Sequence, residues 1–155
     1  KDIADRYFQL GHFSYSFKRT LDVHEDCDCG ECQLRNYINS PEVINFINQI
    51  TQSNVTTADE LFSSLYEEGD FLSIHHDGPN GKLGFVYNLC PDWLPDWGGL
   101  LHTLDDDRKK VINTYVPGFN TLTLFDSSDD TGYPHYVSHV VNKKSKRISF
   151  TGWYK

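Results

Sequence analysis

Apolar residues between positions 43 and 50 recur at the spacing of an α-helix. They are Val43, Ile44, Phe46, Ile47 and Ile50, and residues three and four apart share one side of a helix. The preceding Ser40-Pro41-Glu42 supplies a capping hydroxyl, a proline suited to the first turn and an acid that favours a helix N-terminus. This pattern predicts one amphipathic helix over residues 40–52 that packs on a sheet.

Beyond this helix the pattern changes to short segments rich in β-branched and aromatic residues. Turn residues separate the segments, as in Gly78-Pro79-Asn80-Gly81. The segments that we expect to be strands are residues 60–66, 71–76, 84–89, 99–104, 111–115, 121–125, 135–141 and 147–154. A series of short strands after a helix is typical of a double-sheet jelly roll. The sequence therefore predicts a mainly β fold, a double-stranded β-helix (jelly roll) with a supporting N-terminal helix.

The N-terminal third has two further features. Aromatic residues are dense between positions 8 and 17, which indicates a strand, and residues 22–31 are charged and cysteine-rich, which indicates a loop. Since no repeat or linker interrupts the 155 residues, we predict a single domain over residues 1–155. Residues 1–58 would hold the N-terminal strand, the cysteine-rich loop and the helix, and residues 59–155 the jelly-roll core. Because the sequence has no Met, we expect that Lys1 is not a translation start and that earlier residues were removed.

Charge and cysteine use narrow the expected partners and location. The net charge of −8 argues against nucleic acid or an anionic membrane as the main partner and is compatible with a basic peptide. No apolar run approaches the roughly 20 residues of a membrane span, and residues 1–10 are too polar for a signal peptide. Three of the four cysteines are crowded together, unlike the framework of a disulfide-stapled secreted domain. We therefore expect an intracellular (cytoplasmic) location.

His75 and Asp77 lie two residues apart at the end of a predicted strand, where alternate side chains share a face. Both can therefore hold one ion, whereas His76 points to the other face. Two imidazoles and one carboxylate can bind one face of an Fe(II) ion and leave the opposite face open. Such a site needs a second histidine from a distant strand.

Three other histidines are candidates for this third ligand. His135 starts a predicted strand just after a loop, so it would lie at the mouth of the barrel, near the end of the strand that carries His75. His139 shares the face of His135 but lies about 13 Å further along the strand, and His102 lies between leucines. We therefore expect His135 to be the ligand. A single histidine is more often a surface or core residue than a metal ligand. The metal site is therefore predicted from His75, Asp77 and His135 together.

The order and spacing of four blocks within residues 60–154 resemble the 2-oxoglutarate- and Fe(II)-dependent dioxygenases, and within them the prolyl hydroxylases. The blocks are Leu65-Tyr66, His75-His76-Asp77, residues 92–100 with Trp97-Gly98-Gly99, and residues 134–140 followed by residues 146–154. The similarity is to the branches that modify a ribosomal protein and the hypoxia factor. The N-terminal third, with its cysteines, matches neither branch.

The resemblance implies catalytic roles for His75, Asp77, His135 and Arg147. The first three would bind Fe(II). Arg147 would pair with the distal carboxylate of 2-oxoglutarate, which suits the planar fork of a guanidinium. Further cosubstrate contacts implied by position are Tyr66 as a hydroxyl donor, Asn88 as a polar contact, and Leu89, Leu101, Val137 and Trp153 as pocket lining.

The function that the resemblance implies is a dioxygenase that uses Fe(II), 2-oxoglutarate and dioxygen, with ascorbate as reductant. The expected substrate is a prolyl residue of a protein or peptide, hydroxylated while 2-oxoglutarate is decarboxylated to succinate. The presence of Asp77 favours hydroxylation over halogenation, because related halogenases replace this carboxylate with a small residue. Alternatives are the same chemistry on another amino-acid side chain or a small molecule, and a non-catalytic jelly-roll binding module.

The cysteine-rich segment suggests a second metal site. His24, Cys27, Cys29 and Cys32 are potential zinc ligands within nine residues. The Cys29-x-x-Cys32 spacing suits a ligand pair, and His24-x-x-Cys27 supports it, whereas Cys27-x-Cys29 is less usual. A structural zinc site is one hypothesis, and an acidic loop with reduced thiols is the other.

Overall fold

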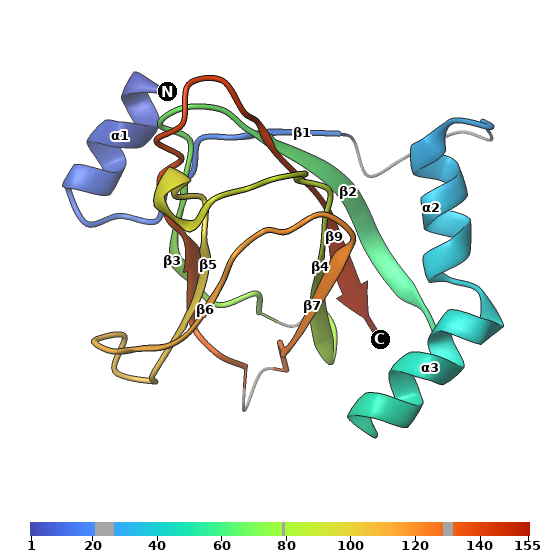
Figure 1. The fold of residues 1–155 in the computed structure, drawn as a ribbon. Helices are drawn as coiled ribbons and strands as arrows, with labels where there is room; N and C mark the ends of the chain where they lie inside the picture. The colour runs from blue at the N-terminus through green and yellow to red at the C-terminus, as the bar shows by residue number, and fades with distance from the viewer. Residues whose placement is uncertain (21–26, 79, 129–131) are drawn as a thin grey trace.

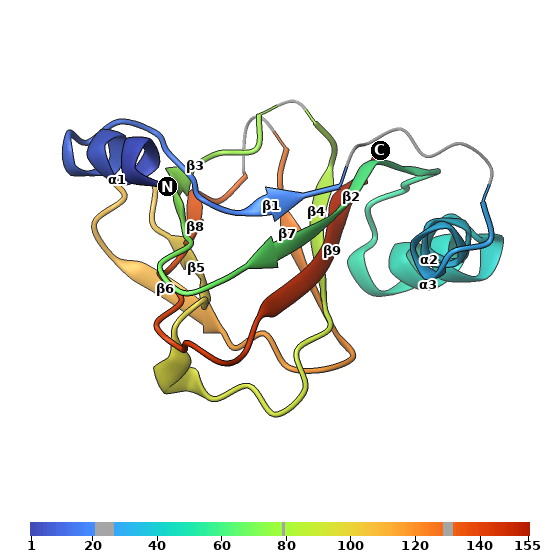
Figure 2. The same cartoon turned by 90° about the horizontal axis from the view of Figure 1, so that it is seen from above.

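A computed structural model describes the chain except for residues 21–26, 79 and 129–131. In the described residues, strands form two antiparallel sheets that face each other (Figures 1 and 2). The larger has the order β1-β2-β9-β4-β7 and the smaller the order β3-β8-β5-β6. The strands are β1 (Lys18–Arg19), β2 (Ala58–Tyr66), β3 (Leu72–His75), β4 (Leu83–Asn88), β5 (Leu101–Leu104), β6 (Val111–Tyr115), β7 (Thr121–Asp126), β8 (His135–Val137) and β9 (Arg147–Tyr154).

The predicted mainly β jelly roll is confirmed. Each of the eight segments expected to be strands overlaps one of the observed strands, from β2 to β9. A short 3₁₀ helix, η1 (Pro95–Trp97), precedes β5. Gly98 follows η1 with a φ of 69°, and a Cβ there would clash with the carbonyl oxygen of His139. The close approach of these two backbones explains why glycine follows Trp97.

The predicted amphipathic helix is also confirmed, as α3 (Pro41–Thr51). The Ser40 side chain accepts a hydrogen bond from the backbone N–H of Val43, which caps the helix N-terminus. Val43, Ile44 and Ile47 are buried against side chains of β4 and β9. Phe46 and Ile50 remain about half exposed, because they lie toward the edge of the apolar face.

The expectation of a strand over residues 8–17 was wrong. The structure has a helix, α1 (Asp2–Gln9), and then an extended segment that makes one isolated bridge, between Tyr15 and Leu72, before β1 begins. The helix docks through Phe8, whose ring lies 4.9 Å from that of Phe71. The aromatic density therefore reflects contacts with the sheets rather than membership of a sheet.

The cysteine-rich loop expected over residues 22–31 holds only in part. Residues 22–26 lie outside the described residues, and a further helix, α2 (Gly30–Ile38), begins inside the expected loop. Only Cys32 and Ile38 of α2 are buried. The helix therefore has no stripe of apolar residues at helical spacing that would predict it from the sequence. An ion pair between Glu31 and Arg35, one turn apart, supports it instead. Of the helices described, none is long and apolar enough to cross a membrane.

The core has two parts that together position the site. One lies between helices α2 and α3 and the larger sheet, and it includes Ile47, Phe85 and Phe150. The other lies between the two sheets and includes Leu101 and Val137. Helix α1 lies on one side of the sheets, and α2 and α3 lie on the other (Figures 1 and 2).

Candidate active site

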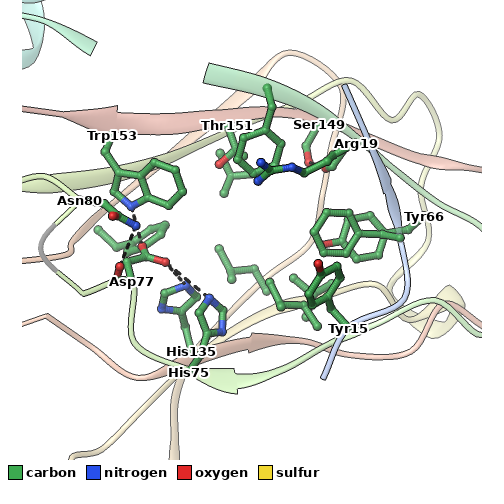
Figure 3. A pocket seen from close by; sticks show the side chains of 18 of the residues that line it. Tyr15, Arg19, Tyr66, His75, Asp77, Asn80, His135, Ser149, Thr151 and Trp153 are labelled. Carbon is green, nitrogen blue, oxygen red and sulfur yellow. Dashed lines mark hydrogen bonds and ion pairs between the residues drawn. The ribbon is translucent and has the colours of Figure 1, made fainter. Parts of the chain in front are cut away.

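A cavity of about 270 Å³ lies between the two sheets. Figure 3 shows His75, Asp77 and His135 at one end of the cavity and Tyr66 and Ser149 at the other. Arg147 also lines this second end, since its guanidinium lies over the Tyr66 ring. The cavity therefore has two chemically different ends.

The two histidines come from neighbouring strands of the smaller sheet. His75 ends β3, His135 starts β8, and the two residues are paired in the antiparallel register. Their ring centroids lie 4.3 Å apart. Oδ1 of Asp77 lies 3.4 Å from Nε2 of each histidine. One ligand atom from each residue lies within 4.8 Å of the other two, as one metal ion requires.

Hydrogen bonds fix which ring nitrogen of each histidine faces Asp77. Nδ1 of His75 lies 2.9 Å from the carbonyl oxygen of Ser73, and Nδ1 of His135 lies 3.0 Å from that of Tyr133. A carbonyl oxygen only accepts, so each Nδ1 carries a proton, and each Nε2 can donate to Asp77 when it is protonated and presents a lone pair when it is not. Two lone pairs and a carboxylate oxygen then converge, an arrangement that fits a divalent cation.

The Asp77 carboxylate is held in its ionised form. Burial disfavours its charge, but hydrogen bonding to His135 and His75 outweighs burial and lowers the pKa of Asp77 well below its usual range. The indole Nε1 of Trp153 donates a hydrogen bond of 2.9 Å to Oδ2 (Figure 3). Trp153 thereby leaves Oδ1 turned toward the two histidines. Gly84 makes room, since a Cβ there would lie 3.1 Å from Oδ2.

The opposite end of the cavity holds a buried cation. Arg147, the first residue of β9, is 2% exposed. Its Nη1 donates to the hydroxyl of Ser149, its guanidinium lies 4.8 Å from the ring centroid of Tyr66, and its Nε has no hydrogen-bond partner within the described part of the chain. Among the described residues no carboxylate pairs with it. Burial lowers the pKa of the guanidinium, yet arginine stays charged in proteins. An uncompensated buried cation fits an anionic ligand group.

Several polar residues near Arg147 were not foreseen. Ser149 and Ser64 are buried and share a hydrogen bond of 2.8 Å between their hydroxyls. Ser149, Thr151 and Trp153 all line the cavity with Arg147. They follow Arg147 at intervals of two along β9, and such residues share a face of a strand. Alternation from Arg147 would therefore have found Ser149 and Thr151, in addition to Trp153, which was already expected as pocket lining.

The expected cosubstrate contacts divide into two groups. Tyr66, Leu101, Val137 and Trp153 line the cavity, whereas Asn88 and Leu89 are not among its lining residues. Asn88 is buried on β4 and donates to the hydroxyl of Thr121. Burial raises the pKa of Tyr66 to about 12, so its hydroxyl stays protonated and can donate.

The extended N-terminal segment forms one wall of the cavity. Phe13, Tyr15, Phe17 and Arg19 all line it, at intervals of two. The Phe17 ring stacks on Tyr66 with centroids 4.6 Å apart, and the Arg19 guanidinium lies 4.7 Å from the ring centroid of Phe62. Phe13 and Tyr15 are about half exposed. This wall could not be assigned from the sequence, because the segment makes little ladder pairing.

The cysteines gather apart from the cavity. Sγ of Cys27 lies 3.1 Å from that of Cys29 and 2.6 Å from that of Cys32. Neither these three residues nor Cys90 lines the cavity. His24, the fourth expected zinc ligand, lies outside the described residues. The structure therefore brings together three of the four expected ligands.

The sequence profile of the 2OG-Fe(II) oxygenase superfamily matches residues 61–155. The mouse prolyl 3-hydroxylase OGFOD1 is 27% identical over 114 residues, which are 70% of this chain and 21% of that protein. The chain therefore spans about a fifth of the length of this curated relative.

Solved structures of prolyl hydroxylases share the fold. A Pseudomonas putida prolyl-4-hydroxylase superposes with a TM-score of 0.65 at 20% identity, covering 99% of this chain and 82% of that one. A Trichoplax adhaerens prolyl hydroxylase in complex with a hypoxia inducible factor peptide superposes with a TM-score of 0.65 at 23% identity, covering 99% of this chain and 74% of that one. A viral collagen prolyl hydroxylase from Paramecium Bursaria Chlorella virus-1 superposes with a TM-score of 0.66 at 14% identity, covering 99% of this chain and 85% of that one.

Proposed function

The chain belongs to the 2OG-Fe(II) oxygenase superfamily, and from this premise we propose that it is an Fe(II)- and 2-oxoglutarate-dependent dioxygenase that hydroxylates prolyl residues of a protein or peptide. The observation that carries the proposal is the cavity with two unlike ends. One end gathers His75, Asp77 and His135 around a point suited to a cation. The other holds the buried cation of Arg147.

The metal end would hold Fe(II) through His75, Asp77 and His135. Two imidazoles and one carboxylate are the ligand set of non-haem Fe(II) oxygenases, and they leave open positions for small ligands. When bound, Fe(II) together with 2-oxoglutarate and dioxygen supplies the oxidising power that inserts oxygen into a C–H bond, with succinate and carbon dioxide as products. The protein's own part is to hold the ligand atoms and to exclude water.

The opposite end would anchor 2-oxoglutarate. Arg147 would pair with its distal carboxylate, and Ser149, whose hydroxyl already accepts from Arg147, lies beside it. Tyr66 keeps its proton and packs over the guanidinium, so it would both donate a hydrogen bond and shield the ion pair from water. The arrangement would orient the keto end of the cosubstrate toward the three iron ligands.

The aromatic wall supports a prolyl substrate. Phe13 lies 5.6 Å from the His75 ring, centroid to centroid, and Tyr15 lies beside Phe17 at 5.2 Å. A proline ring is apolar and rigid, and aromatic faces bind such rings well. The relative and the structural neighbours named above are prolyl hydroxylases. Another amino-acid side chain or a small molecule is the second candidate for the same cavity.

Ascorbate as reductant and an intracellular (cytoplasmic) location belong to the same proposal. A reducing location is supported by the crowding of Cys27, Cys29 and Cys32, which is unlike the framework of a disulfide-stapled secreted domain. The expected zinc would not contact the iron or the substrate, because its cysteine ligands do not line the cavity.

Turnover with peptides tests the proposal. The wild-type chain, supplied with Fe(II), 2-oxoglutarate and ascorbate, is expected to form succinate faster when proline-containing peptides are added. Mass spectrometry should show a peptide heavier by one oxygen atom, placed on proline by fragmentation. His135→Ala should abolish both signals, because the metal site loses a ligand.

His102→Ala is the matched control. His102 lies one residue from Leu101 on β5 and contacts Tyr136 and Thr114 outside the cavity, so its loss should leave turnover unchanged. Succinate formation that no proline peptide stimulates would refute the prolyl substrate and favour the second candidate. Absence of succinate from an iron-loaded wild type would refute the dioxygenase itself.

A further inference from the structure

Three cysteine thiols cluster at the start of α2, away from the catalytic cavity. Cys29 is the N-cap of the helix, Cys32 lies in its first turn, and Cys27 precedes both. The Sγ of Cys29 lies 3.6 Å from that of Cys32, and all three sulfur atoms lie within 4.8 Å of one another. Cys27 and Cys29 are exposed, so a dissolved ion can reach the cluster.

We propose that Cys27, Cys29 and Cys32 bind a zinc ion through three thiolates. Zinc–sulfur bonds are about 2.3 Å long in tetrahedral sites, which sets the sulfur atoms about 3.8 Å apart. The observed separations of 2.6 to 3.6 Å require the sulfurs to spread by about 0.2 to 1.2 Å. Cys27 and Cys29 are exposed, so these two side chains can move while the buried Cys32 stays in place. Each thiol releases its proton to solvent on binding.

The ligand type favours zinc over the catalytic metal. Soft thiolates select zinc and Cu(I), whereas the imidazole and carboxylate ligands of the cavity suit Fe(II). Three protein ligands leave the fourth tetrahedral position to water or another donor. The chain would therefore hold two different metals at two separate places.

The zinc ion would brace one wall of the catalytic cavity. Glu31, between two of the ligands, accepts hydrogen bonds from the hydroxyls of Thr20 and Ser63, each 3.0 Å long. Thr20 directly follows β1, and its backbone N–H donates to the carbonyl of Ser63 on β2. Arg19 of β1 lines the cavity. Fixing the start of α2 would thus fix the strand that forms this wall.

Cobalt and zinc binding to the full chain test the site. The protein would be reduced, stripped of metal and handled without oxygen. Asp77→Ala serves as the background, because it weakens the cavity's own metal site and leaves the thiols intact. This variant should bind one zinc ion per chain after desalting. Co(II) should give it a near-ultraviolet thiolate-to-cobalt charge-transfer band, which histidine and carboxylate ligands do not produce.

Adding Cys27→Ser and Cys29→Ser to that background should remove the zinc and the band. Both positions are exposed, so an unchanged circular dichroism spectrum is expected to show that the fold survives. A matched Cys90→Ser variant should keep both signals, since Cys90 lies outside the cluster.

Three results would overturn the proposal. They are no zinc retention by the Asp77→Ala chain, equal retention by the double cysteine variant, and a disulfide between two of the three cysteines that persists after the reducing treatment. None of these results bears on turnover, so the zinc site and the dioxygenase can fail separately.

Discussion

At the scale of single residues, the site depends on neighbouring groups whose hydrogen bonds orient the three metal ligands. Backbone carbonyls two residues before each histidine fix the protonated nitrogens of His75 and His135. Trp153 does the same for Asp77 by occupying Oδ2. Partners of this kind typically change metal affinity by about 10- to 100-fold. Sequence spacing suggested Trp153 only as pocket lining, because a hydrogen bond across two sheets leaves no trace in the order of residues.

Trp153→Phe is expected to weaken metal binding by about tenfold, because Asp77 loses the donor that orients its carboxylate. Anaerobic calorimetric titration with Fe(II) or Mn(II) measures the metal affinity of each variant. Trp97→Phe is the control, since Trp97 packs edge-on against Trp93 and does not line the cavity. Equal affinities in wild type and Trp153→Phe would remove this role from Trp153.

Tyr154→Phe is expected to raise the free energy of unfolding by about 1 kcal/mol, because the Tyr154 hydroxyl is buried and none of the described residues forms a hydrogen bond with it. Tyr87→Phe is the matched comparison. Its hydroxyl donates to Oδ1 of Asn120 over 2.6 Å, so its removal should cost about 0.5–1 kcal/mol. Urea unfolding measures both, and a destabilised Tyr154→Phe would show that the hydroxyl has a partner in solution.

Alkaline pH should reveal the same hydroxyl. Burial raises the pKa of Tyr154 to about 12, against about 10 in an unfolded chain. A raised folded-state pKa means that the contribution to stability is complete below about pH 10 and is lost as pH rises toward about 12. Tyr154→Phe should therefore lose less stability than wild type over that range. Parallel losses in the two proteins would contradict the raised pKa.

At the scale of elements, what could be predicted depended on whether a local pattern decides the structure. Helix α3 and strands β2 to β9 follow from periodicity and turn residues, so all were anticipated. Helix α1 and the wall formed by Phe13, Tyr15 and Phe17 were not, because their places are set by docking on distant residues such as Phe71 and Tyr66. Helix α2 was missed because one ion pair and the bonds of Glu31 support it rather than an apolar stripe.

Ile47→Ala is expected to destabilise the protein by about 2–5 kcal/mol, because Ile47 is fully buried between α3 and the larger sheet. Ile50→Ala makes the same chemical change on the same helix, where the side chain is 54% exposed, and should cost less than about 1 kcal/mol. Denaturant unfolding of the pair measures the difference. Similar losses would mean that α3 does not pack through the predicted face.

At the scale of the whole molecule, the jelly roll places residues from distant parts of the chain around one cavity. Antiparallel pairing of β3 with β8 sets His75 opposite His135, and β9 carries Arg147 and Trp153 across the facing sheet. The sequence supported the identity of these residues but not the register, which depends on loops and packing. The division into residues 1–58 and 59–155 of a single domain stays a prediction. The N-terminal segment nevertheless contributes to the cavity, since Arg19 lines it.

Anaerobic binding of 2-oxoglutarate tests the two-ended cavity most directly. Wild type loaded with Fe(II) should bind one 2-oxoglutarate per chain, with the visible absorption of an iron–2-oxo acid chelate. His135→Ala should lose that absorption. Arg147→Ala should keep iron but bind 2-oxoglutarate about 10- to 100-fold more weakly, because an ionic hydrogen-bonded pair is lost. Arg108→Ala, at an exposed position, is the control. Binding that depends on neither the iron nor Arg147 would contradict the account.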